Sequence, residues 1–291
     1  MSDCLNLPAG PHCAVLVHGL GANQLELGKL AQALHREGFS VVVPRIPGYT
    51  MDSGEADHTA WGNALEQRVR QLKTRFESVS LVGLSMGATL CLQVASQVDV
   101  DALVLLSICL AYDGWSMPWY SGLMRWARYI PFARRFKLLE KEPYGVKNTD
   151  LRAMIKKSMQ SHHVSESGVE ALEFRLILNG FELIRSAWRT LHAVKAPTLF
   201  IHAVDDEVAH IRTPERAFEQ LASPSKEFIY LGDCYHMITV DNEREQVKQD
   251  VTRFLKERMN AKTGSAVFAV PEVISPELRR SLRRKAREFV Q

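Results

Sequence analysis

Residues 79–90 read VSLVGLSMGATL, and within this stretch a β-strand pattern changes into a helix pattern around one serine, Ser85. Apolar and β-branched residues precede the serine, and helix-forming residues follow from Met86. Gly83 and Gly87 flank Ser85 in the spacing Gly-x-Ser-x-Gly, in which small residues let the backbone bend tightly and push the serine side chain out of a sheet. A turn whose glycines serve only close packing is the structural alternative, so a functional serine needs partners elsewhere in the chain.

Around this turn, short apolar runs alternate with longer stretches of helical periodicity. Because the short runs are continuously apolar, they fit a parallel sheet that helices cover on both faces. The predicted strands are residues 13–17, 39–44, 79–83, 101–107, 197–202 and 227–232, and the predicted helices are residues 25–37, 58–76, 86–97, 213–222 and 243–259.

The segment between the fourth and fifth predicted strands is too long for one crossover connection, so we expect an inserted subdomain there. Its first part is rich in Trp, Met and Arg, and its later part has helical periodicity. Near the C-terminus a short linker leads to a last helix with Ser275 as N-cap and Pro276 at its first position. The expected division is a core of residues 1–110 and 195–260, an inserted cap of residues 111–194, and a tail of residues 261–291.

Composition limits the classes of function. The chain has 291 residues, is 46% hydrophobic and carries a net charge of +3, which suits one large globular domain and is too small a charge to favour nucleic acid as a partner. The N-terminus carries Asp3 and lacks a basic region followed by an apolar run, so no secretory signal peptide is predicted. No apolar run is long enough to predict a transmembrane helix.

The five cysteines are scattered without a paired metal-ligand spacing. This pattern favours reduced thiols in a cytoplasmic protein and predicts no metal site. Three cysteines lie in strongly apolar stretches and are expected in the core: Cys13, Cys91 and Cys109.

A nucleophilic serine needs a base to take its proton and an acid to orient that base. In an open parallel sheet such groups follow later strands, in the order serine, acid, histidine. Asp205 and Asp206 follow the fifth strand, and both remain candidates for the acid. Of the ten histidines, His210 and His236 come after this loop, and His210 is too near to belong to the next strand end. His236 is therefore the predicted base.

An acyl-transfer site also needs donors for a developing oxyanion. The backbone N–H of Met86 is one candidate, because it opens the helix after the serine and lies at the positive end of that helix. The second candidate is the N–H of Leu20 in the turn His18-Gly19-Leu20-Gly21 after the first strand. We expect the His18 side chain to brace this turn.

At these positions the chain resembles the α/β-hydrolases of the bacterial carboxylesterase and monoacylglycerol lipase type. The resemblance rests on four stretches: LVHGLG (16–21), GLSMG (83–87), PTLFIHAVDDEV (197–208) and CYHMITVDNEREQVKQDVTRFL (234–255). It implies an α/β-hydrolase fold, a mostly parallel sheet covered by helices on both faces with an inserted helical cap, and no cofactor.

The resemblance also assigns residues. In the family the acid stands three residues after a glycine, and because Ala203 occupies that position here, the acid falls on Asp206. The family's oxyanion donors correspond to Leu20 and Met86, and its catalytic histidine to His236. The remaining loop acids are then expected to be solvated: Asp205, Glu207 and Asp233. The chain departs from the family in two places. Gly48-Tyr49 stands where the family often has Gly-His, and because the chain begins almost directly at its first parallel strand, we expect the leading edge strands of the sheet to be missing.

The function implied is a serine hydrolase that cleaves carboxylic esters of medium to long acyl chains, like a carboxylesterase or monoacylglycerol lipase. A thioesterase or acyltransferase with the same triad is the alternative, and a non-catalytic binding protein of this fold is less favoured. Apolar side chains of the insertion form either a substrate wall or the core of the cap itself. They are Trp115, Met117, Trp119, Met124 and Trp126.

The last predicted helix carries six basic residues against two acids, with an apolar stripe along one side. The stripe consists of Leu278, Leu282, Ala286 and Phe289. Such a helix fits peripheral contact with an anionic membrane, at the inner face of the membrane for a cytoplasmic protein. Docking of the stripe on the core or on a second subunit is the alternative. The sequence leaves the oligomeric state open.

Overall fold

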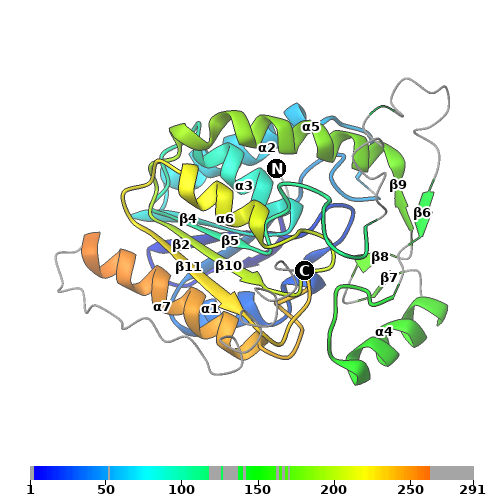
Figure 1. Cartoon of the computed structure of the whole chain (residues 1–291). Helices are drawn as coiled ribbons and strands as arrows, with labels where there is room; N and C mark the ends of the chain where they lie inside the picture. Colours follow the sequence, from blue (N-terminus) through cyan, green and yellow to red (C-terminus); the bar gives the residue numbers. More distant parts are fainter. Residues whose placement is uncertain are drawn as a thin grey trace.

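The computed structural model describes residues 3–51, 53–117, 126, 137–139, 142–161, 164–165, 168–169 and 171–262. Its centre is a seven-stranded sheet with helices on both faces (Figure 1). In spatial order the strands are β1 (Asp3–Leu7), β3 (Ser40–Pro44), β2 (His12–Val17), β4 (Ser78–Leu84), β5 (Ala102–Leu106), β10 (Thr198–Ala203) and β11 (Lys226–Leu231). β1 is antiparallel to β3, and all other neighbours in the sheet are parallel.

All six predicted strands are present, but the expectation that leading edge strands are missing is wrong. β1 pairs with β3 at the edge of the sheet, and half-buried and exposed residues alternate along it. A search for continuous apolar runs passes over such an alternating strand. Asp3 fixes its start through an ion pair of 2.5 Å with Arg68.

The helices form two layers (Figure 1). On one face lie α2 (His58–Lys73), α3 (Met86–Ala95) and α6 (Arg212–Gln220), and on the other lie α1 (Leu30–Arg36) and α7 (Arg244–Lys262). The helix predicted for residues 25–37 is two pieces, the 3-10 helix η1 (Gln24–Leu27) and α1. Gly28 separates them with φ 54°, and a Cβ there would lie 2.6 Å from the Thr239 carbonyl oxygen.

The core consists of two apolar layers, one on each side of the sheet. In β2, Val15 and Val17 face α2 and α3, whereas Ala14 and Leu16 face α1 and α7. Successive side chains of a strand point to opposite faces, so a sheet covered on both sides needs continuous apolar runs. The three cysteines predicted to be in the core are buried there.

The insertion follows β5 and contains α4 (Thr149–Ser161), the strand pair β6 (Lys137–Leu139) and β9 (Ala171–Glu173), the strand pair β7 (Val164–Ser165) and β8 (Gly168–Val169), α5 (Phe174–Thr190) and η4 (Leu191–Ala193). Figure 1 shows α4 and β6–β9 beyond the carboxyl ends of the strands. α5 lies within the residues expected to form the cap, yet it packs on α2 and α3. Leu183 and Ala187 of α5 are buried in the core, so α5 forms an outer layer of the main domain.

The tail predicted for residues 261–291 lies almost wholly outside the described residues, and so does its basic helix. In the part of the chain that the structure describes, no helix combines the length and the apolar character that spanning a membrane requires.

Candidate active site

Ser85 occupies a sharp turn between β4 and α3, with φ 56° and ψ −121°. A positive φ is uncommon for a residue other than glycine and persists only where surrounding structure enforces it. The flanking glycines allow the close packing: a Cβ on Gly83 would lie 2.4 Å from the Ala88 Cα, and one on Gly87 would lie 2.3 Å from the His18 carbonyl oxygen. The Ser85 side chain makes no capping bond to α3. The hydroxyl is therefore held away from the helix and is available to another partner.

That partner is His236, and the structure joins the three predicted residues in one hydrogen-bonded chain. Ser85 Oγ lies 2.7 Å from His236 Nε2, and His236 Nδ1 lies 2.7 Å from Asp206 Oδ2. The three residues follow β4, β11 and β10, whose carboxyl ends meet at one edge of the sheet. Asp206 and His236 are buried, and Ser85 is half-buried.

The environment of Asp206 fixes its charge and direction. Its Oδ1 accepts the Val208 and Ala209 N–H groups at 2.9 and 2.8 Å. Burial opposes ionisation, but the charge and hydrogen bond of His236 outweigh it and hold the pKa of Asp206 below its ordinary value. Since a carboxylate only accepts, Nδ1 of His236 carries a proton, and in the neutral imidazole Nε2 is then free to accept from Ser85. Asp205 points elsewhere, with its carboxylate 3.4 Å from Lys147 Nζ.

His236 is correspondingly more basic than an ordinary histidine. Burial lowers its pKa, but the charge and hydrogen bond of Asp206 outweigh burial and raise the pKa to about 9. A second histidine, His202, lies behind the acid, with Nε2 3.3 Å from Asp206 Oδ2 and 2.9 Å from the Ala209 carbonyl oxygen. Burial lowers the pKa of His202, so this ring is a neutral brace for the loop.

The turn after β2 presents the second predicted oxyanion donor. Gly21 N–H donates to the Tyr49 carbonyl at 3.0 Å, and Ala22 N–H donates to the Gly19 carbonyl at 3.4 Å. Within the described part of the chain, the Leu20 and Met86 N–H groups have no acceptor. Both predicted donors are thus free of acceptors from the described part of the protein.

Side chains on two sides hold this turn. His18 Nδ1 lies 2.9 Å from the Gly19 carbonyl oxygen, so His18 braces the turn as expected. Tyr49, which stands where the family often has histidine, is fully buried and donates its hydroxyl to the His18 carbonyl at 3.1 Å. Although Tyr49 departs from the family pattern, its hydroxyl and its carbonyl both make hydrogen bonds that hold the turn after β2.

Two buried acids near the site were not predicted. Glu26 of η1 accepts the Gly19 N–H through Oε2 at 2.8 Å. Glu207 was expected to be a solvated loop acid, and this is wrong: it is 2% exposed and accepts the His236 N–H through Oε2 at 3.0 Å. Residues 114–116 cover it, because the Ser116 N–H and hydroxyl both donate to the Glu207 carbonyl. Asp233 is exposed, as predicted for a solvated loop acid.

The insertion is attached to the histidine loop through a buried carboxylate, Asp241. It accepts the N–H groups of Lys147 and Asn148 from the insertion at 2.8 and 3.0 Å, and that of Tyr235 at 2.9 Å. Because Tyr235 directly precedes His236, these bonds tie the start of α4 to the loop that carries the histidine.

The predicted substrate wall is only partly within the described residues. Trp115 is 58% exposed, donates its indole N–H to the Asp205 carbonyl and packs edge-on against Tyr235. Met117 is half-buried, and Trp126 is 53% exposed. Trp119 and Met124 lie outside the described residues.

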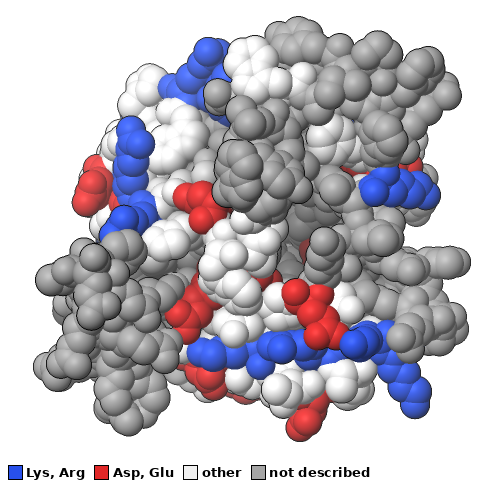
Figure 2. Space-filling view, turned by 45° about the vertical axis from the view of Figure 1, so that its right-hand side comes forward, with Lys and Arg blue, Asp and Glu red and all other residues white. Residues whose placement is uncertain are grey.

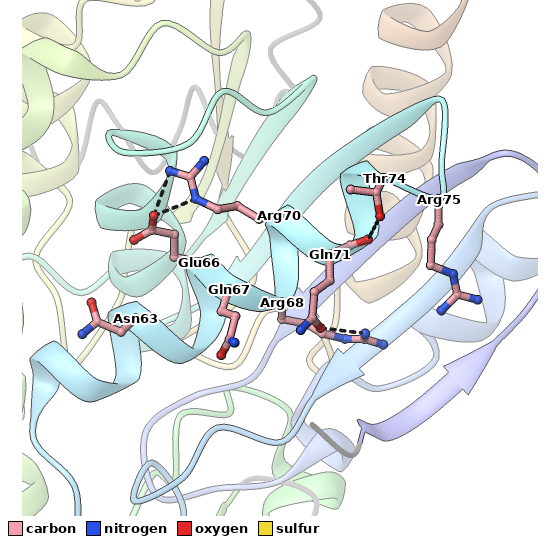
Figure 3. Close-up of a pocket in the computed structure, with 8 residues that line it drawn as sticks. All are labelled: Asn63, Glu66, Gln67, Arg68, Arg70, Gln71, Thr74 and Arg75. Carbon is pink, nitrogen blue, oxygen red and sulfur yellow. Dashed lines mark hydrogen bonds and ion pairs between the residues drawn. The ribbon is translucent and has the colours of Figure 1, made fainter.

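Figure 2 turns the carboxyl edge of the sheet toward the reader, and acidic and basic side chains are interspersed there among the described residues. A separate hollow lies on the outer face of α2, away from Ser85 (Figure 3). Its charged groups include Arg70, which pairs with Glu66, and Arg68, which pairs with Asp3. Within the described ranges, no group of three or more His, Cys, Asp or Glu side chains is arranged to hold a metal ion.

The buried Glu207 gives a prediction about stability. Burial and the charge of Asp206 raise its pKa from 4.5 to about 7. Between these two pH values Glu207 is ionised in the unfolded chain and still protonated in the folded chain, so its contribution to stability falls as pH rises through this window. Glu207→Gln keeps an acceptor for His236 and removes this dependence. We expect its Tm, relative to wild type, to increase from about pH 5 to about pH 8.

Thermal unfolding of both proteins across this range measures the effect. Asp233→Asn, which neutralises an exposed acid of the histidine loop, is the matched control and should show a smaller trend. A Tm difference between Glu207→Gln and wild type that stays constant with pH would contradict the assignment of a buried, protonated Glu207.

Comparison with known proteins agrees with this geometry. The profile of the family described as serine aminopeptidase, S33, matches residues 11–244. A carboxylesterase of Bacillus subtilis (strain 168) is 22% identical over 252 residues, which are 85% of this chain and 93% of that protein. A thermostable monoacylglycerol lipase of Bacillus sp. (strain H-257) is 24% identical over 241 residues, which are 82% of this chain and 88% of that protein.

Among solved structures, the monoacylglycerol lipase of Paleococcus ferrophilus superposes with a TM-score of 0.73 at 20% identity, covering 89% of this chain and all of that one. The likeness confirms the fold that the sequence motifs imply. The chain has the α/β-hydrolase fold and belongs to the serine aminopeptidase S33 family.

Proposed function

We propose that this protein is a serine hydrolase that cleaves carboxylic esters through an acyl-enzyme on Ser85. The observation that carries the proposal is the continuous hydrogen-bonded chain from Asp206 through His236 to Ser85, next to two unoccupied N–H donors. Two relatives that align over most of the chain, named as a carboxylesterase and a monoacylglycerol lipase, support ester cleavage over the other chemistries of the fold.

The geometry supports the following steps. His236 Nε2 takes the proton of Ser85 Oγ while that oxygen attacks the ester carbonyl carbon, and Asp206 stabilises the imidazolium that forms. The carbonyl oxygen becomes an oxyanion and accepts from the Leu20 and Met86 N–H groups. The tetrahedral intermediate collapses, the alkoxide leaves with the proton from His236, and the acyl group remains on Ser85. Water then repeats the cycle with His236 as base, which releases the acid.

Apolar residues packed against the side chains of the two donor residues support an acyl substrate of medium to long chain. A Cβ built on Gly180 of α5 would lie 2.9 Å from the Tyr112 hydroxyl, 3.2 Å from the Met86 Cε and 3.5 Å from the Leu20 Cδ2, so this helix passes beside the side chains of both donor residues. The same part of α5 contributes the buried Phe174, Ile177 and Leu178. Apolar side chains next to an oxyanion site favour a hydrocarbon acyl group. Trp115 lies on the other loops of the site, where it contacts Asp205 and Tyr235.

The leaving group separates the main proposal from its alternatives. A thioesterase or an acyltransferase would form the same acyl-enzyme on Ser85 and differ in the thiol released or in the nucleophile that resolves it. Among the described residues in Figure 2 both signs of charge occur on this face, which is compatible with a neutral ester. We therefore keep a small-molecule ester as the substrate class.

The first test is covalent labelling and turnover. Purified protein should hydrolyse p-nitrophenyl esters of graded chain length faster than matched thioesters or an aminoacyl arylamide. Ser85→Ala should lower kcat by about 10⁴- to 10⁶-fold. A fluorophosphonate followed by peptide mass spectrometry should label Ser85. Ser107→Ala is the matched control: Ser107 directly follows the neighbouring β5, also with positive φ, but is fully buried.

Label on a residue other than Ser85 would contradict the nucleophile. Thioester cleavage faster than ester cleavage with Ser85 labelled would move the function to the thioesterase alternative.

The second test concerns the acid. Asp206→Asn should lower kcat by about 10⁴-fold, because His236 loses the partner that fixes its tautomer. Asp205→Asn, one residue away, removes a half-buried ion pair with Lys147 and leaves the contacts of His236 in place, so it should cost less than about fivefold. Steady-state kinetics of the two variants measures the ranking, and the reverse ranking would assign the role to Asp205.

We also propose a cytoplasmic protein in peripheral contact with an anionic membrane through the basic helix predicted for residues 275–290. This proposal rests on the sequence, where six basic residues flank a narrow apolar stripe. Each basic residue near an acidic membrane adds about 1 kcal/mol to binding.

Co-sedimentation with anionic liposomes tests this contact. The full chain should bind at low salt and lose binding at high salt, whereas a chain ending at Lys262, the last residue of α7, should not bind. Equal binding of both chains would contradict the proposal, and so would binding that ignores lipid charge. Loss of thermal stability on truncation without any lipid binding would support docking of the helix on the core.

A further inference from the structure

Glu26 is a buried acid that the triad does not use. It lies in η1, the short helix that follows the turn after β2, and is 6% exposed. Its backbone carbonyl accepts the Thr239 hydroxyl from the loop after His236. Glu26 thus lies between the turn that carries Leu20 and the loop that carries the histidine.

The hydrogen bonds of the turn isolate one amide. Glu26 accepts the Gly19 N–H, the Tyr49 carbonyl accepts the Gly21 N–H, and the Gly19 carbonyl accepts the Ala22 N–H. In the described structure, the Leu20 amide alone of this set has no acceptor. The Leu20 N–H shares a peptide with the Gly19 carbonyl, which His18 Nδ1 and the Ala22 N–H contact. The peptides on either side of it are held by Glu26 and by the Tyr49 carbonyl, so Glu26 is one of the groups that orient the Leu20 N–H.

The contact between Glu26 and Gly19 is close. A Cβ on Gly19 would lie 2.6 Å from Glu26 Oε2 and 3.4 Å from its Cδ. The carboxyl group packs directly on the glycine, and a buried donor left without an acceptor is energetically unfavourable. Without the Glu26 oxygen, we expect the peptide between His18 and Gly19 to rotate so that the Gly19 N–H finds another acceptor.

The charge state of Glu26 suits this place. Burial raises its pKa from 4.5 to about 8, against the lowering effects of the Gly19 hydrogen bond and the charge of His236. Near neutral pH the carboxyl group therefore holds its proton and accepts through one oxygen. A full negative charge there would oppose the oxyanion that develops beside Leu20.

We propose that Glu26 is a positioning residue for the oxyanion turn: its Oε2 fixes the Gly19 peptide and thereby directs the Leu20 N–H toward the oxyanion. This inference rests on the proposed function, since it assigns Glu26 a part in the same site. Glu26 acts through the backbone of the turn and does not touch the reacting atoms.

Two substitutions of similar size separate positioning from simple packing. Glu26→Gln keeps an acceptor for the Gly19 N–H, and kcat should stay within about threefold of wild type. Glu26→Met fills the same space without an acceptor, and kcat should fall by about 10- to 100-fold, below the loss for removing a whole oxyanion donor. KM should change by less than about threefold, because the interaction lost strengthens only in the transition state.

A long-chain trifluoromethyl ketone gives an independent measurement, because its adduct with serine places an oxyanion in the same position. Its Ki should rise in Glu26→Met by the same factor as kcat/KM falls, and Glu26→Gln should restore both. Glu66→Gln and Glu66→Met on the outer face of α2 (Figure 3) are the matched controls and should match wild type.

Glu26→Met with wild-type kcat and Ki would overturn the inference, and so would equal losses in the Gln and Met variants. If Glu26→Met does not fold, Glu26→Asp replaces it: the carboxyl group stays but is one methylene too short, and full activity would likewise overturn the inference. Failure of the proposed function is distinguishable, because wild type itself would then show no ester turnover and no label on Ser85.

Discussion

The backbone of Ser85 is the constraint on which the rest of the site depends. With φ at 56°, the chain turns from β4 into α3 within one residue and leaves the hydroxyl outside both elements. The turn is possible because Gly83 and Gly87 let backbone atoms approach within distances that a Cβ would block. The same close approach brings the N-terminus of α3 against the turn after β2, so the strained serine and both free amides belong to one packed unit.

Electrostatics around His236 explains why the pKa of one acid is lowered and the pKa values of two others are raised. Asp206 makes hydrogen bonds with two backbone amides and with His236, and its pKa is lowered. The pKa values of Glu207 and Glu26 are raised to about 7 and 8, since burial disfavours further negative charge. Both of these acids accept a backbone N–H, from His236 and Gly19 respectively. The interaction between Asp206 and His236 thus makes the histidine more basic, as the proposed function requires. Glu207 and Glu26 hold the backbone of the histidine loop and of the turn after β2.

Much of this arrangement could be predicted from the sequence, and the omissions have physical causes. The carboxyl ends of parallel strands meet at one edge of the sheet. Because Ser85 and His236 each follow a predicted parallel strand, the sequence alone predicted that they lie close together. The choice of Asp206 over Asp205 needed the family resemblance, because side-chain direction depends on the turn after β10. Burial of an acid leaves no local pattern: Glu207 sits among other acids, and Glu26 in a four-residue helix too short for periodicity. The helical pattern of α5 was visible, but its packing on α2 and α3 was not.

The central claim is that His236, made more basic by Asp206, activates Ser85. The pH dependence of the rate constant for fluorophosphonate labelling of Ser85 tests it most directly. Only neutral His236 can take the serine proton, so the rate should rise with pH along a single titration whose midpoint lies above 6.5, the ordinary pKa of histidine. In Asp206→Asn the midpoint should move down and the maximal rate should fall. A rate independent of pH, or a midpoint that Asp206→Asn leaves unchanged, would contradict the account.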